Sequence, residues 1–165
     1  MPLIEKITPC LWFDHQAEAA ALLYTSTFPN SRIVSIARFA GAGQGIHGMP
    51  EGSVMTVAFE LDGQPFTALN GGSMFKFNEA ISLQVGCDSQ AQLDQIWQQL
   101  AEGGDPAAQQ CGWLKDRFGL SWQIVPRVLL SMLTDSTTAR AARVTQAMLH
   151  MKKFDIAGLT QAFER

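Results

Sequence analysis

The chain has 165 residues, of which 47% are apolar and only 16% are charged, and its formal net charge at pH 7 is −3. This length suits one domain, or two small halves that share a core. The negative charge argues against nucleic acid as the main ligand, because phosphate binding needs a basic surface. The low charged share indicates that some surface is buried against a partner, for which we expect a homodimer.

Neither membrane insertion nor secretion is indicated by the sequence. It contains no apolar run of membrane-spanning length, and its first residues lack the charged-then-apolar pattern of a signal peptide. Cys10, Cys87 and Cys111 have no metal-like spacing and all lie in strand-like stretches. Thiols of this kind are typical of a reducing compartment, so we expect a cytoplasmic protein without membrane contact.

The first half of the chain has the pattern of a strand, a helix and three further strands. Residues 7–13 form a compact apolar run, and Asp14 stands where the N-cap of the helix over residues 16–28 is expected. Asp62-Gly63 is a strong two-residue hairpin signal between two of the later strands. These strands are predicted over residues 33–39, 54–61 and 65–69.

A glycine-rich segment interrupts this half at residues 41–52, and we expect a mobile loop there. Its His47 is a candidate for chemistry, but a histidine in such a loop is more often simply exposed. The glycines do not follow a strand and open a helix in the manner of a phosphate-binding loop.

The second half repeats the same order about 74 residues later, beginning with a strand over residues 81–87. Asp88-Ser89 caps a helix whose Leu93, Ile96, Trp97 and Leu100 recur at helical spacing, and Gly103-Gly104 ends it. About three strands are expected to follow. After Pro126 the pattern is helical, and Asp155 caps a last helix with Phe154 as a hydrophobic staple.

Residues 111–126 form the most unusual stretch, because two tryptophans and a charged triplet lie within one predicted hairpin. The turn over residues 116–119 uses Gly119 for a positive φ, and Pro126 ends strand pairing. Leu120, Trp122 and Ile124 alternate with Ser121, Gln123 and Val125, so one face of the second arm is strongly apolar. The hairpin is either the main binding element or simply the last hairpin of a sheet, with Trp113 and Trp122 in the core.

Several motifs together resemble one known family over nearly the whole chain. The chain is similar to the PhnB-like group of the vicinal oxygen chelate superfamily, whose domain is labelled 3-demethylubiquinone-9 3-methyltransferase. The motifs that support the resemblance are Trp12-Phe13-Asp14, Glu18-Ala19-Ala20, Phe28-Pro29, residues 61–66, Ala68-Leu69-Asn70-Gly71-Gly72, Phe75-Lys76-Phe77, residues 111–119, residues 121–126 and residues 147–153.

This resemblance implies an α+β fold of two tandem βαβββ units, whose mixed sheets curl around a cleft, followed by C-terminal helices. We therefore expect a single domain over residues 1–165. Within it, residues 1–78 hold the first unit and a linker, residues 79–126 the second unit, and residues 127–165 the helical tail.

Metal-dependent members of the superfamily place His or Glu ligands on the first and last strands of the units. At the corresponding final-strand position this chain has Gln123, a weak neutral ligand, and its first strand has no His, Asp or Glu before Asp14. Glu79 lies near the place where the second unit often has a histidine. S-adenosylmethionine enzymes use a glycine-rich strand-to-helix turn, which the sequence also lacks. We therefore expect neither a metal nor another cofactor.

The sequence leaves three functions open. The protein binds a small organic ligand without turnover, or it is an enzyme for a small oxygen-rich or aromatic molecule, or its polar residues only complete the sheets. Metal-dependent glyoxalase-like or dioxygenase-like chemistry and methyl transfer remain alternatives, and the residues name no reaction. Amide and aromatic side chains suit a neutral polar ligand, so the predicted ligand-binding residues are Trp12, Asn70, Phe75, Gln84, Trp113, Asp116 and Gln123.

Overall fold

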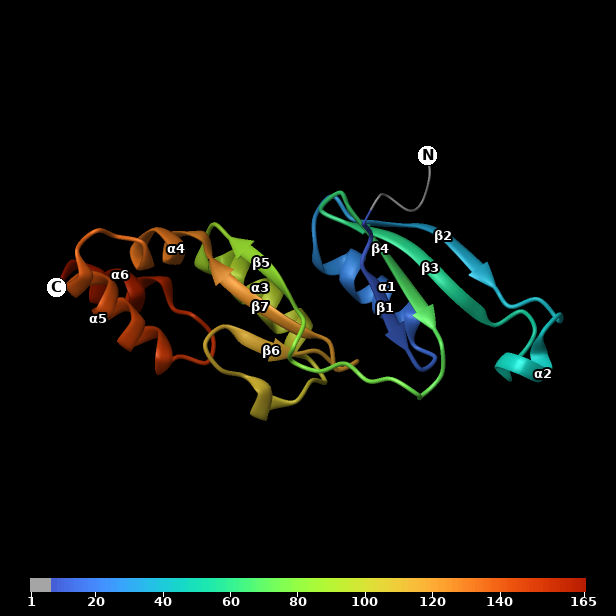
Figure 1. Ribbon diagram of the computed structural model, residues 1–165. Helices are drawn as coiled ribbons and strands as arrows, with labels where there is room; N and C mark the ends of the chain where they lie inside the picture. Colours follow the sequence, from blue (N-terminus) through green and yellow to red (C-terminus); the bar gives the residue numbers. More distant parts are fainter. Residues whose placement is uncertain (1–6) are drawn as a thin grey trace. The chain divides into compact units, whose positions relative to one another are not determined.

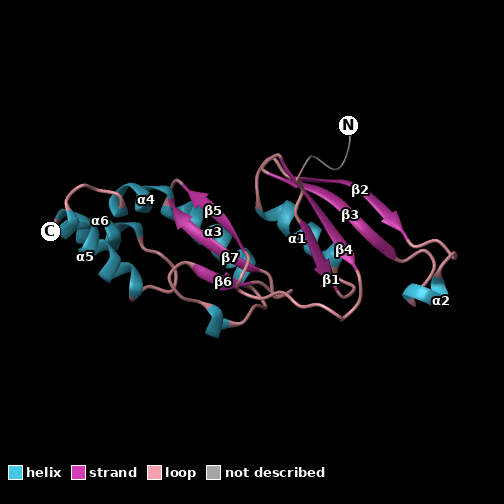
Figure 2. Ribbon diagram, in the orientation of Figure 1, coloured by secondary structure: helices cyan, strands magenta, loops and turns pink. Residues whose placement is uncertain are grey.

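The computed structural model describes residues 7–165, and the chain divides into two compact units at Lys76 and Phe77 (Figure 1). The predicted α+β class is confirmed. One mixed sheet has four strands and the other three, neither sheet is closed, and three helices follow the second sheet (Figure 2). Among residues 7–165, no helix is both long enough and apolar enough to cross a membrane.

The first unit has the predicted βαβββ order, with a short additional helix. Its strands are hydrogen-bonded in the order β1-β4-β3-β2, and β1 pairs parallel with β4 while the other pairs are antiparallel. The first strand begins at Cys10, three residues later than expected. The elements are β1 (Cys10–Phe13), α1 (Ala17–Thr27), β2 (Arg32–Arg38), α2 (Gln44–His47), β3 (Val54–Leu61) and β4 (Gln64–Asn70).

The core of this unit lies between α1 and one face of its sheet. Val57, Phe59 and Leu61 of β3 are buried at alternate positions, as a half-buried strand requires. Helix α1 contributes buried alanines and Tyr24 to the same layer. The turn between β3 and β4 is confirmed at Asp62-Gly63, where both residues have positive φ.

Two local expectations for the first unit are wrong. Asp14 is not the N-cap of α1: the helix begins at Ala17, one residue later than expected, and the Ala17 N–H is satisfied from another strand by donating to Asn70 Oδ1 at 2.9 Å. The glycine-rich segment is not only a loop, since it contains α2. Gly43 and Gly48 flank that helical turn with φ values of 84° and 66°, which only glycine adopts readily.

The second unit contains β5 (Ser82–Cys87), α3 (Gln90–Ala101), a 3-10 turn at Pro106–Ala108, β6 (Trp113–Lys115) and β7 (Ser121–Pro126). Its strand order is β5-β7-β6, with β5 parallel and β6 antiparallel to β7. The expected third strand after the helix is therefore replaced by the 3-10 turn and an isolated bridge between Gln110 and Trp113. Pro106 lacks a ladder donor and the segment has little apolar alternation, which accounts for the difference.

The predicted hairpin is formed by β6 and β7, of which β7 is the central strand of the second sheet and β6 an edge strand. Leu120, Trp122 and Ile124 are buried on one face, where they form a core with Leu93, Ile96 and Leu100 of α3. Ser89 caps α3 as predicted, accepting from Gln92 N at 3.2 Å. This burial leaves the other face of β7 free of the helix.

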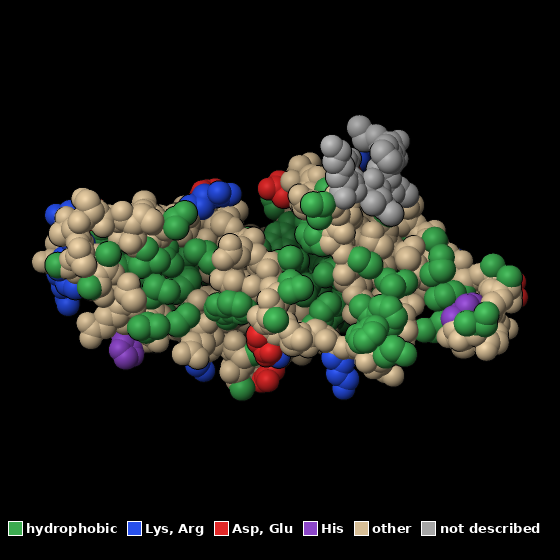
Figure 3. All heavy atoms as spheres, in the orientation of Figure 1, with side chains coloured by type: hydrophobic (Ala, Val, Ile, Leu, Met, Phe, Trp, Pro, Cys, Tyr) green, Lys and Arg blue, Asp and Glu red, His purple; other side chains and the backbone are tan. Residues whose placement is uncertain are grey.

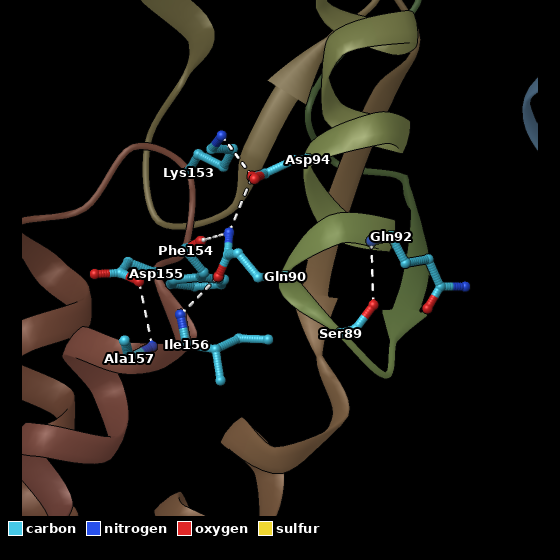
Figure 4. A network of polar contacts seen from close by, with 9 residues as sticks. All are labelled: Ser89, Gln90, Gln92, Asp94, Lys153, Phe154, Asp155, Ile156 and Ala157. Atoms are coloured by element: carbon cyan, nitrogen blue, oxygen red, sulfur yellow. Dashed lines mark hydrogen bonds and ion pairs between the residues drawn. The ribbon is translucent and has the colours of Figure 1, made fainter.

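The C-terminal tail contains α4 (Arg127–Leu133), α5 (Thr138–Leu149) and α6 (Ile156–Glu164). Figure 4 shows how it is attached to α3 through the side chain of Gln90. That carboxamide donates to the Phe154 carbonyl at 3.1 Å and to Asp94 at 2.9 Å, and accepts from Ile156 N at 2.8 Å. Asp155 caps α6 as predicted by accepting from the backbone N–H groups of Ala157 and Gly158.

Candidate functional site

The face of the second sheet that points away from α3 holds three of the seven candidate residues. Because side chains alternate along a strand, burial of Trp122 and Ile124 against α3 places Ser121 and Gln123 on the opposite face. The strand register then assigns the neighbours on that face. Trp113 and Gln84 flank Gln123, while Lys115 and Ser82 flank Ser121. We call these six residues the open face.

The first row of the open face is Trp113–Gln123–Gln84. Gln84 Nε2 donates to Gln123 Oε1 at 3.3 Å, and Gln123 Nε2 donates to Ser82 Oγ at 2.7 Å. Gln84 is exposed, while Gln123 and Trp113 are half-buried. Carboxamides donate and accept without carrying charge, so the row offers polar groups beside an indole ring. The structure thus brings together three of the seven predicted site residues.

Asp116, a fourth predicted site residue in this unit, is used within the hairpin. It is only 2% exposed, and its Oδ1 accepts from Phe118 N at 2.8 Å and Leu120 N at 3.1 Å. Its Oδ2 accepts from the indole nitrogen of Trp122 at 2.9 Å. These contacts fix the turn and the buried tryptophan, so Asp116 has a structural role in the protein.

The remaining three predicted site residues lie in the first unit. Trp12 donates to the Gly72 carbonyl at 2.8 Å, and its ring contacts Phe75 edge-to-face with centroids 4.9 Å apart. Asn70 is buried, and besides capping α1 it donates to the Val54 carbonyl at 3.0 Å. Trp12 and Phe75 therefore form an aromatic pair, while both ends of the Asn70 amide are bonded within the unit.

Lys115 and Ser121, which form the second row of the open face with Ser82, were not predicted as site residues. Lys115 forms an ion pair with Glu79, and the hydrogen bond from Lys115 lowers the pKa of that carboxyl below its usual value. Ser121 is 1% exposed, yet its Oγ has no hydrogen-bond partner within residues 7–165. The two-residue period that places both side chains beside Trp113 and Gln123 is visible in the sequence once the strands are known.

The residues of this face do not fit a divalent metal ion. Within residues 7–165 there is no group of three His, Cys, Asp or Glu side chains that could hold one. The amide of Gln123 is bonded to Ser82 and Gln84, and the carboxylate of Glu79 is paired with Lys115. Such a donor set lacks the converging carboxylates or imidazoles that hard cations require.

Gly71-Gly72 also does not fit a cofactor-binding turn. Gly71 N donates to the Phe13 carbonyl at 2.9 Å and Gly72 N donates to the Asp14 carbonyl at 3.2 Å. A cofactor cradle of the dinucleotide type needs backbone N–H groups that point at the ligand. In this chain, those N–H groups connect β4 to the end of β1.

His47 has a local structural contact in place of a catalytic partner. Its Nδ1 accepts from Met49 N at 3.0 Å, and its ring lies 4.7 Å from that of Phe39. The histidine therefore closes the segment around α2 onto the end of β2.

Charged side chains make up a small share of this protein, as its composition of 16% charged residues shows. In Figure 3 apolar side chains are visible over each unit, with Asp, Glu, Lys and Arg side chains scattered among them. The large apolar side chains of the first unit that are exposed include Val34, Ile36 and Ile46, the last at 95%. Val34 and Ile36 lie two residues apart on β2, and exposed apolar side chains that gather in this way are typical of an interaction site.

Comparison with known proteins gives one family and several similar structures. Residues 5–125 match the family model described as 3-demethylubiquinone-9 3-methyltransferase. A solved structure described as a putative 3-demethylubiquinone-9 3-methyltransferase, PhnB protein, from Bacillus cereus has 36% identity and a TM-score of 0.63, covering 74% of this chain and 99% of its own. Protein PA1353 from Pseudomonas aeruginosa has 20% identity and a TM-score of 0.56, covering 74% of this chain and 98% of its own, which supports the fold.

A weaker likeness links the chain to the fosfomycin resistance protein FosX from Mesorhizobium loti, at 14% identity and a TM-score of 0.49, covering 85% of this chain and 99% of its own. Comparison with curated protein sequences found no match.

Proposed function

The chain belongs to the PhnB-like family described as 3-demethylubiquinone-9 3-methyltransferase, within the vicinal oxygen chelate superfamily, and from this premise we propose that it binds a small organic molecule on the open face without a metal ion. The observation that supports this most directly is the row Trp113–Gln123–Gln84. It combines an aromatic surface with two neutral amides that have unused hydrogen-bonding capacity. A planar molecule whose polar groups are uncharged where they contact this row matches these groups.

Trp113 is available for such a contact, unlike two other tryptophans of the chain. The indole nitrogen of Trp12 is bonded to Gly72 and that of Trp122 to Asp116, whereas the indole nitrogen of Trp113 has no acceptor within residues 7–165. A ligand stacked on Trp113 would lie next to Gln123, its neighbour across the strands. In this proposal the side chains of Asn70 and Asp116 do not contact the ligand, because their polar atoms already have partners.

Methyl transfer and metal-assisted chemistry are not part of the proposal. The N–H groups of Gly71 and Gly72 are bonded within the first unit, and the open face lacks the donors of a metal centre. Neither serine hydroxyl of the open face is hydrogen-bonded to a base within residues 7–165, since Ser82 Oγ accepts from Gln123 and Ser121 Oγ has no partner, so we propose ligand binding in place of a named reaction.

We propose in addition that the protein is a homodimer and acts in the cytoplasm. Exposed Val34 and Ile36 on the edge strand β2, together with Ile46, offer an apolar surface that a second copy would cover. Its three cysteines are free, as is typical of a reducing compartment. Sedimentation at increasing protein concentration tests the dimer, and a monomer at all concentrations would contradict it.

Binding is tested by titrating ¹⁵N-labelled protein with catechol, a neutral aromatic probe with two adjacent hydroxyl groups. We expect the side-chain NH₂ signals of Gln84 and Gln123 and the indole signal of Trp113 to shift together. Gln123→Leu should weaken catechol binding about tenfold, since it removes hydrogen bonds worth about 1.4 kcal/mol. Gln98→Leu, an exposed change on α3, is the control and should leave the affinity unchanged.

Two outcomes would contradict the proposal. One is a titration in which none of these three side chains responds, or in which Gln123→Leu binds as tightly as the unchanged protein. The other comes from elemental analysis of the purified protein. About one metal ion per subunit would require a metal-dependent function instead.

A further inference from the structure

We propose that the ligand of the open face carries a carboxylate, and that Lys115 and Ser121 bind this group when it displaces Glu79. The inference rests on the proposed function, because it assigns the charged end of a ligand whose planar part lies on Trp113, Gln123 and Gln84. The ligand class is therefore a planar, aromatic or conjugated monocarboxylate. Three observations on the second row of the open face support it.

The first observation is the position of Lys115. It lies two residues from Trp113 on β6, so both side chains are on the same face of the sheet, and it is directly opposite Ser121 on β7. A ligand that covers Trp113 and Gln123 would reach Lys115 one step farther along the same strands. Lysine supplies a positive charge and three donors to an anionic oxygen.

The second observation is the partner that Lys115 already has. The side chain of Glu79, from the segment that precedes β5, forms an ion pair with it. Lys115 thus binds a carboxylate in this structure. Because the Glu79 side chain is 64% exposed, the pair is one of the surface type that contributes little stability, and a competing carboxylate can replace it.

The third observation is the hydroxyl of Ser121. It lies between Lys115 and Ser82 in the register, is 1% exposed, and its Oγ has no hydrogen-bond partner among the described residues. A buried hydroxyl without a partner is unusual, since burial normally requires a hydrogen bond. A ligand carboxylate held by Lys115 would accept from this hydroxyl with its second oxygen.

The arrangement also explains why the face holds amides rather than further charges. Lys115 is its one charged member, so a single anionic group can be neutralised at one end while the neutral row contacts the rest of the molecule. A ligand with two negative charges would place the second against uncharged amides. One carboxylate per ligand is the expectation.

The test compares benzoate with benzamide, its neutral analogue, by titrating the full-length ¹⁵N-labelled protein. We expect benzoate to bind about tenfold more tightly than benzamide. Glu79→Gln removes the competing carboxylate at an exposed position, so benzoate should bind about threefold more tightly still, with benzamide unchanged. Lys115→Met keeps most of the side-chain stem and should reduce benzoate to the affinity of benzamide. Lys153→Met breaks the comparable ion pair with Asp94 and should change neither the affinity for benzoate nor that for benzamide.

The results separate the inference from the proposed function. Equal affinities for benzoate and benzamide, both with shifts at Gln84, Gln123 and Trp113, would overturn the carboxylate assignment and leave binding at the open face intact. Tight benzoate binding that neither Glu79→Gln nor Lys115→Met alters would also overturn it. No response of that row to benzoate, benzamide or catechol would overturn the proposed function itself. Because Glu79→Gln changes an exposed side chain, the test does not depend on the folding of the Lys115→Met variant.

Discussion

The ring of Phe154 packs directly on Gly112, so closely that a Cβ atom at position 112 would overlap its Cε2 atom. Gly112 also has a positive φ of 78°, and its N–H donates to the Lys152 carbonyl at 2.8 Å. The tail that precedes α6 is thus bound to the start of the hairpin that forms the open face. Glycine at this position is required by both backbone conformation and close packing.

Replacing Gly112 by alanine should therefore destabilise the protein more than a positive φ alone explains. Gly119 provides the matched control, because it has a φ of 87° but nothing within 4 Å of its Cβ position. We expect Gly119→Ala to reduce the free energy of unfolding by about 1 kcal/mol. Gly112→Ala should cost about 1–3 kcal/mol more, since Phe154 must move. Urea unfolding measures both, and equal losses would show that the Phe154 contact is unimportant.

Replacing Asp116 by asparagine tests its structural role. An amide can accept two of the three hydrogen bonds, but its NH₂ group cannot accept from Trp122 Nε1. We expect the free energy of unfolding to fall by about 1–3 kcal/mol, as for a buried group that loses its partner. Asp105→Asn, at an exposed helix cap, should cost less than about 0.5 kcal/mol.

The same Asp116 variant distinguishes this role from the ligand contact that the sequence predicted. Catechol affinity should be unchanged at a temperature where Asp116→Asn is still folded. Unchanged stability together with weakened catechol binding would restore Asp116 to the ligand-binding set.

Features encoded by neighbouring residues were predictable from the sequence. The turn at Asp62-Gly63, the cap at Ser89 and the hairpin through Gly119 each depend on local backbone preferences, and the structure confirms them. The alternation that placed Gln123 on one face and Trp122 on the other is equally local. The α+β class followed from the family resemblance, whose motifs can also be read directly from the sequence.

Contacts between distant residues were not predictable in the same way. The cap of α1 comes from Asn70, 53 positions away, so the local candidate Asp14 misled the prediction. The pairing of Lys115 with Glu79 and the burial of Ser121 likewise depend on how separate strands are placed side by side. A periodicity pattern indicates on which face of a strand or helix a residue lies, but not which distant residue it contacts.

Replacing Gln90 by alanine should loosen the tail. The change removes the acceptor of Ile156 N and the donor to the Phe154 carbonyl, leaving two half-buried backbone groups without these partners. We expect a loss of about 1–3 kcal/mol in the free energy of unfolding, and faster amide hydrogen exchange in α6 than in α3. Gln95→Ala, at an exposed position of the same helix, should alter neither the free energy of unfolding nor the hydrogen exchange of α6. Equal exchange of α6 in both variants would argue against Gln90 as the attachment point.

Cys87 should make the stability of the protein depend on alkaline pH. Burial, with a smaller contribution from Asp88, raises the pKa of this thiol from 9.0 to about 11. Because the folded-state pKa lies above the unfolded one, the neutral thiol contributes stability that is complete below pH 9 and is lost as pH rises toward 11. Urea unfolding of the unchanged protein and of Cys87→Ala at several pH values measures this contribution. The difference between their free energies of unfolding should shrink by about 1–2 kcal/mol across the window, at up to about 1.4 kcal/mol per pH unit. Taking the difference cancels the titration of lysines, which the two proteins share. A difference that does not change with pH would show that the thiol titrates alike in the folded and unfolded chains.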